Sequence, residues 1–149
     1  MKPTDLTLDE HGPYYSHFIG LVPEDLSIVP ALDHSAQVVQ ALMETVPFDK
    51  HEYRYAPGKW TIKEVLLHLA DTERIFMYRA LRFARMDKTP LPGFEQDEYV
   101  AHADLSDRSL NDVLYEYQLV RQQSIGFLQT LSEEELLRVG IASDNQVSV

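Results

Sequence analysis

The segment from Thr61 to Met86 constrains the fold more than any other part of the chain, because it combines a marked helix start with helical periodicity. The start shows the capping-box pattern Thr61-Ile62-Lys63-Glu64, in which Glu64 reaches back to the backbone of Thr61. At about 100° per residue, the apolar side chains of this segment fall on two flanks of one helix. They are Ile62, Val65, Leu69, Phe76, Ala80 and Phe83 on one flank, and Leu67 and Tyr78 on the other. We therefore predict a long helix that is buried on more than one side.

The remaining segments also carry helical rather than alternating periodicity, and proline or glycine separates them. Four further helices are expected, within Pro23–Val46, within Glu95–Ala101, within Leu110–Leu131 and from Ser132 to near Gly140. Pro30 would stand at a start or kink of the first, and Ser109 would cap the third. With 149 residues and no internal repeat, the chain is predicted to be one all-α domain, residues 1–149.

Composition narrows the functional classes. A formal net charge of −11 and a pI near 4.8 disfavour binding to nucleic-acid phosphates. The absence of cysteine excludes disulfides, thiolate metal ligands and a cysteine nucleophile. No apolar run approaches the roughly 20 residues that a bilayer requires, and the N-terminus lacks the apolar core of a signal peptide. We expect a cytoplasmic protein with no membrane or nucleic-acid partner.

A polar stripe runs between the two apolar flanks of the Thr61–Met86 helix. Glu64, His68, Asp71, Thr72 and Arg79 fall within about 60° of one another on this helix. A neutral imidazole is a common ligand for divalent metals, and a nearby carboxylate can fix its tautomer. Spacing alone favours a structural role, in which His68 lies at the edge of the core and bonds to Asp71 or Glu64. One helix cannot by itself assemble a three-ligand site.

The other candidate features are weaker. Five further histidines are dispersed and form neither H-x-x-x-H nor H-E-x-x-H with a partner: His11, His17, His34, His51 and His102. The aromatic residues Tyr53, Tyr55 and Trp60 precede the central helix, where they could line a pocket or belong to the core. No nucleophile elbow, P-loop or dinucleotide fingerprint is present, so serine hydrolases, nucleotide hydrolases and Rossmann enzymes have no support.

The stretch from Tyr53 to Arg74, with its core K-W-T-I-K-E-V-x-x-H-L-x-D-x-E, resembles the signature of the DinB/YfiT-like superfamily of proposed metalloenzymes. The resemblance continues through Tyr78-Arg79-Ala80-Leu81 and Pro90-Leu91-Pro92-Gly93-Phe94, and covers the chain from about Pro30 to its end. It implies a four-helix bundle of up-down-down-up topology, a homodimer, and a divalent metal such as zinc or nickel held by three histidines. His68 matches one of those histidines.

The resemblance places the other two histidines in an H-x-x-x-H pair on the last helix, which the 149 residues lack. Because 145–149 resembles the lead-in to a helix, we expect a C-terminally truncated chain whose last helix is missing or incomplete. We further expect tight metal binding only in a full-length form, with weak or no binding in the 149-residue chain.

The resemblance implies a metal-dependent enzyme, with thiol-dependent S-transfer or hydrolysis as its reaction and a small molecule or low-molecular-weight thiol as its substrate. His68 would be a metal ligand and Asp71 would orient it, while Glu64 would act mainly as a helix cap. Metal binding would acidify a thiol or water and so supply the nucleophile that this cysteine-free chain lacks. The alternative is a non-catalytic, stress-associated module for binding or dimerisation. The catalytic residues stay unassigned.

Overall fold

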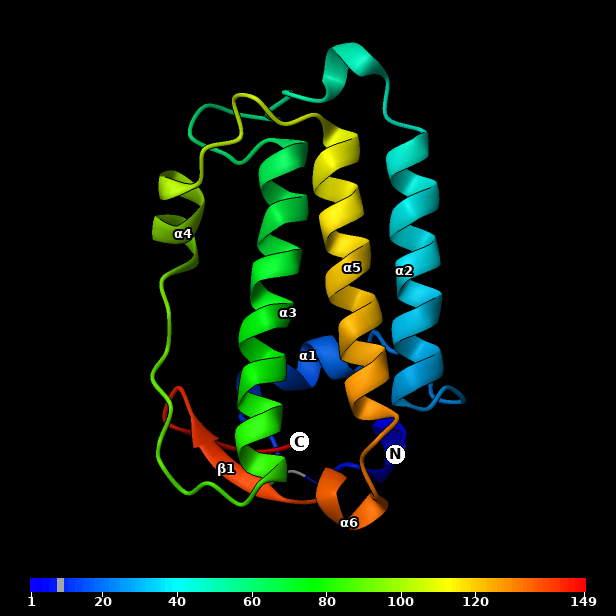
Figure 1. The fold of residues 1–149 in the computed structure, drawn as a ribbon, viewed down its shortest axis with the longest axis vertical. Helices are drawn as coiled ribbons and strands as arrows, with labels where there is room; N and C mark the ends of the chain where they lie inside the picture. Colours follow the sequence, from blue (N-terminus) through cyan, green and yellow to red (C-terminus); the bar gives the residue numbers. More distant parts are fainter. Residues whose placement is uncertain (8–9) are drawn as a thin grey trace.

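Three long helices dominate the computed structural model, which describes residues 1–7 and 10–149. They are α2 (Ile28–Glu44), α3 (Ile62–Ala84) and α5 (Leu110–Leu128). Figure 1 shows α2 running upward and both α3 and α5 running downward, with α5 between the other two. These directions are the first three of the up-down-down-up order expected from the sequence. The parallel pair α3 and α5 is joined by a long crossover that contains α4 (Gln96–His102).

Short elements surround the three long helices. The chain begins with η1 (Pro3–Asp5), η2 (Pro13–Tyr15) and α1 (Ser16–Ile19), and η3 (Phe48–Lys50) follows α2. After α5 come α6 (Glu133–Leu136) and a hairpin of β1 (Val139–Ala142) and β2 (Asn145–Ser148). Within the described residues, none of the helices has the length and apolar character needed to cross a membrane.

The predicted helix starts are confirmed. Thr61 caps α3 by accepting a hydrogen bond from the Glu64 amide, and the Glu64 carboxylate accepts one from the Thr61 amide at 2.6 Å. Ser109 with Asp112 forms the same reciprocal pair at α5, and Ser132 with Glu135 does so at α6. Each box satisfies backbone N–H groups that have no partner within their own helix.

The core lies mainly between α3 and α5. Its buried members are Leu66, Leu67 and Ala70 of α3, Leu105 of the crossover, and Leu110, Val113, Tyr117 and Val120 of α5. The flank of α3 that carries Val65, Leu69 and Phe76 had been predicted to be buried, but these three side chains are each more than a third exposed. Ala80 and Phe83 of the same flank are buried, whereas Tyr78 of the other flank is 52% exposed. Burial of α3 therefore changes along the length of the helix and does not separate the two predicted flanks.

The last described residues form a β-hairpin in which Asn145–Ser148 is a strand, and the expectation of a further helix after residue 149 stays a prediction. β1 and β2 pair antiparallel, with Val139 opposite Ser148 and Ala142 opposite Asn145. The two turn residues, Ser143 and Asp144, both have positive φ, as tight hairpin turns require. Backbone hydrogen bonds of Leu91 with Ile141 and Ser143 also hold the hairpin. The helix expected from Ser132 to near Gly140 therefore ends at Leu136, because the chain enters the hairpin at Val139.

Candidate functional site

His68 occupies the middle of the polar stripe on α3, half-buried beneath an aromatic ring. The indole of Trp60 packs against the imidazole with 4.8 Å between ring centroids. Nδ1 of His68 lies 3.3 Å from the Thr72 hydroxyl, one helical turn further along. Burial lowers the pKa of His68, and the charges of Asp71 and Asp97 partly oppose this shift. The ring is therefore neutral at pH 7, with Nε2 making no hydrogen bond to the described residues.

Glu64 is committed to the start of α3. Besides the Thr61 amide, its carboxylate accepts hydrogen bonds from both Nη atoms of Arg54, at 2.8 and 3.1 Å. Burial raises the pKa of Glu64, but the bonds from Thr61 and Arg54 outweigh it and hold the pKa below its usual value. Its role as a helix cap is as expected from the sequence, and the ion pair also anchors the loop before α3.

Among the other stripe residues, Asp71 and Thr72 are partly buried and Arg79 is buried, but they bond to different partners than expected. Asp71 pairs with Arg74 at 3.0 Å rather than with His68. The hydrogen bond expected from Asp71 or Glu64 to His68 is therefore replaced by one with Thr72, and Asp71 acts on the imidazole through its charge alone. Three turns from His68, Arg79 donates to the Pro92 carbonyl at 2.8 Å and so holds the crossover.

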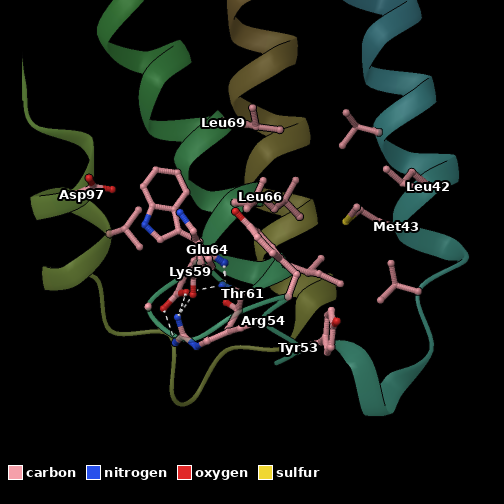
Figure 2. A pocket seen from close by; sticks show the side chains of 18 of the residues that line it. Leu42, Met43, Tyr53, Arg54, Lys59, Thr61, Glu64, Leu66, Leu69 and Asp97 are labelled. Carbon is pink, nitrogen blue, oxygen red and sulfur yellow. Dashed lines mark hydrogen bonds and ion pairs between the residues drawn. The ribbon is translucent and has the colours of Figure 1, made fainter.

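A groove of about 1020 Å³ opens beside this stripe, between α2 and α3. Figure 2 shows Leu42 and Met43 of α2 facing Leu66 and Leu69 of α3 across it. The groove is closed at one end by the loop before α3, whose aromatic residues Tyr53, Tyr55 and Trp60 all line it, together with Arg54 and Lys59. The aromatic cluster therefore does line a pocket, which is one of the two possibilities open from the sequence.

Two buried charges were not identified from the sequence. Glu73 of α3 pairs with Arg121 of α5 at 2.9 Å, and Arg121 also donates to the Leu32 carbonyl of α2 at 2.6 Å. Lys63 donates to the carbonyls of Leu105 and Arg108 and so fixes the loop before α5. Their helical positions lie next to the apolar flanks, but partners 42 to 89 residues away cannot be read from periodicity.

A metal centre needs three or more ligands. Across residues 1–7 and 10–149, no group of three or more histidine, cysteine, aspartate or glutamate side chains is arranged to hold a metal ion. Asp71 and Glu64, the nearest carboxylates on α3, are engaged by Arg74 and Arg54. The described residues thus provide one available imidazole and not a complete metal site.

Fold and site together define a helical-bundle protein whose long second helix carries one neutral, oriented histidine. The model of the DinB superfamily matches residues 31–149, and the chain belongs to that superfamily. The chain is similar in structure to YfiT from Bacillus subtilis, which is described as a probable metal-dependent hydrolase with an unusual four-helix bundle topology. The TM-score is 0.59 and the sequence identity is 16%, and the match covers 85% of this chain and 77% of that chain. No curated protein matches the chain.

Proposed function

We propose that this chain contributes the His68 imidazole to the divalent-metal centre of a metal-dependent enzyme, with hydrolysis or thiol-dependent transfer as its reaction class. The observation that carries the proposal is the state of His68: a neutral ring with a free Nε2 and with Nδ1 beside the Thr72 hydroxyl. A metal binds neutral imidazole, and a bond to the second ring nitrogen fixes the orientation of such a ligand. Membership of the DinB superfamily and likeness to a probable metal-dependent hydrolase support the same proposal.

The described residues do not complete a metal site, but three of them prepare His68 to act as one ligand of such a site. Trp60 limits the rotation of the imidazole by packing against it, with 51° between the two ring planes. Thr72 holds Nδ1, which leaves Nε2 available for a ligand. Asp71 and Asp97 contribute negative charge near the ring, which favours a cation at Nε2. We expect this arrangement alone to bind zinc weakly, through His68.

The test is a zinc titration of the 149-residue chain, followed through the ring resonances of its six histidines by NMR and by calorimetry. Zinc should shift the His68 ring first, in fast exchange, and His68→Ala should remove that response. The control is His102→Ala, because His102 is exposed and already lies beside Glu98 of its own helix. A first response at any histidine other than His68 would contradict the proposal. Tight one-to-one binding that requires His68 would mean that other residues of this chain complete the site.

A non-catalytic binding or dimerisation module is a second candidate, and the apolar groove between α2 and α3 favours it. The two functions differ in what His68 does. A binding module predicts that His68→Ala leaves association unchanged and that zinc produces no His68-dependent response. The zinc titration therefore separates the two candidates directly.

A further inference from the structure

Arg79 of α3 is a buried cation without an acidic partner. It is 7% exposed, and no other arginine of the chain is as deeply buried. Each of the other arginines pairs with a carboxylate, as Arg121 does with Glu73. Arg79 pairs with none in the described part of the chain, although the sequence holds 24 acidic residues against 13 basic ones. A shortage of carboxylates therefore does not explain why Arg79 lacks one.

Uncharged groups surround the guanidinium of Arg79. Its Nη2 donates to the Pro92 carbonyl at 2.8 Å and to the Ser143 hydroxyl oxygen at 3.1 Å. The rings of Phe76 and Phe94 have their centroids 5.6 and 6.0 Å from the guanidinium carbon. These contacts favour a cation, but none of them supplies a negative charge. A guanidinium stays charged at neutral pH, and a buried charge without a counter-charge destabilises a fold.

The remaining donors of this site are available to a ligand. Nε and Nη1 of Arg79 have no hydrogen-bond partner among residues 1–7 and 10–149. Both still reach solvent, because the one enclosed side-chain polar atom without a partner in those residues is Oε1 of Glu10. The Ser143 hydroxyl accepts from Arg79, and its own hydrogen has no acceptor in the same part of the chain. N–H and O–H donors thus lie together beside an uncompensated positive charge.

We propose that Arg79 and Ser143 form a binding site for the carboxylate of a small organic anion that carries an apolar body. Hydrogen bonds between a guanidinium and a carboxylate are strengthened by their opposite charges. The net charge of −11 opposes each further negative charge, which favours a singly charged carboxylate over a phosphate. The apolar body has a surface to contact, because Phe76 is 39% exposed next to the cation.

The site lies apart from His68. Eleven residues separate His68 from Arg79 on α3, which is about 16 Å along the helix axis at about 1.5 Å per residue. The proposal therefore does not rest on a metal at His68. Arg79 belongs to α3, Pro92 and Phe94 belong to the crossover, and Ser143 belongs to the turn of the β1–β2 hairpin, beside the lower end of α3 in Figure 1. A ligand bound there should stabilise the packing of the hairpin and the crossover on α3.

An NMR titration with two isosteric compounds tests the site. Phenylacetate carries a carboxylate on an aromatic body, and phenylacetamide has the same shape without the charge. Phenylacetate should shift the signals of the Arg79 Nε–H group and of the Ser143 amide, and phenylacetamide should bind at least tenfold more weakly. Equal binding of the two compounds would overturn the proposal, as would the absence of any shift up to about 20 mM phenylacetate. Inorganic phosphate that binds as tightly as phenylacetate would overturn the assignment to a carboxylate with an apolar body.

Two substitutions in the site and two controls locate the binding. Arg79→Gln should weaken phenylacetate binding at least tenfold. Ser143→Gly removes the hydroxyl at a position with a φ of 49°, which glycine adopts readily, so the fold should persist while binding weakens about threefold or more. Arg85→Gln changes an exposed arginine of α3 that pairs with Glu135, and His68→Ala changes the proposed metal ligand; both should leave phenylacetate binding unchanged.

The variants also separate a ligand site from a purely structural contact. A structural role for Arg79 predicts that Ser143→Gly binds phenylacetate as the wild type does, and this result would overturn the proposal even if Arg79→Gln does not fold. So would a folded Arg79→Gln with unchanged affinity. Loss of binding in His68→Ala would place the carboxylate at His68 instead, whereas failure of the zinc titration would leave the Arg79 result unaffected.

Discussion

The two sides of α3 contain similar residues in different surroundings. On the side facing α5, Leu66 is 1% exposed and packs in the main core, although it also reaches the groove, while Glu73 pairs with Arg121. On the side facing the groove, Leu69 is 39% exposed although it lies only three residues from Leu66. An apolar position on a helix therefore predicts that another element packs against it, but it does not identify that element. The predictions below measure this difference, beginning with the largest effect.

The buried ion pair should be the most sensitive point on the α5 side. Glu73→Ala removes the carboxylate that compensates Arg121, whose guanidinium stays enclosed among α2, α3 and α5. An uncompensated buried charge typically costs about 3–5 kcal/mol. Urea denaturation should show a loss in this range, and the double change Glu73→Leu with Arg121→Met should recover most of it. A loss below about 1 kcal/mol from Glu73→Ala would mean that water reaches this pair.

A matched pair of leucine substitutions compares the two sides directly. Leu66→Ala opens a cavity in the closed core and should reduce the unfolding free energy by about 2–5 kcal/mol. Leu69→Ala removes the same atoms from a partly hydrated surface and should cost less than about 1.5 kcal/mol. Both are measured by urea denaturation at the same protein concentration. Equal losses would show that the groove side is covered in the isolated chain.

How much of this comparison the sequence could predict depends on how far each interaction extends along the chain. The capping boxes of α3, α5 and α6 involve residues three positions apart, and they could be predicted from the sequence. The pair of Glu73 with Arg121 joins residues 48 positions apart, and no local pattern specifies it. The hairpin was missed for a related reason, because its position depends on distant contacts. A Cβ atom on Gly140 would overlap the ring of Phe83, a contact between residues far apart in the sequence.

The same distinction applies to the site. His68 was identified because its motif is local, and its half-burial followed from its place between two apolar flanks. Its partners were not predicted correctly. Glu64, Asp71 and Thr72 are all within one turn of His68, and helical spacing alone does not choose among them. The choice depends on Arg54 and Arg74, which take the two carboxylates and leave the Thr72 hydroxyl for the imidazole.

A substitution at the start of α3 should reduce stability by an intermediate amount, because the cap supports the whole helix and not one of its sides. Thr61→Ala removes the hydroxyl that accepts the Glu64 amide and so breaks half of the capping box. The expected loss of stability is about 1 kcal/mol, the usual cost of losing a good N-cap. A thermal melt of Thr61→Ser should stay near the wild type, because serine keeps the hydroxyl. If Thr61→Ala also melts like the wild type, Arg54 and the rest of the loop alone fix the helix start.

The smallest effect should be the pH response of His68. Because burial lowers its pKa in the folded chain, the unfolded chain binds a proton there more readily. The stability that comes from a neutral His68 is therefore fully present above the ordinary histidine pKa of about 6.5. It is lost as the pH falls below that value toward the lowered pKa of the folded chain. The unfolding free energy of the wild type, minus that of His68→Gln, should accordingly decrease between pH 7.5 and pH 5.5. Groups common to both proteins cancel in this difference, and His102→Gln serves as the exposed control. An increase at low pH would instead mean that the charges of Asp71 and Asp97 outweigh the burial of the ring, so that His68 is held as a cation on the groove side of α3.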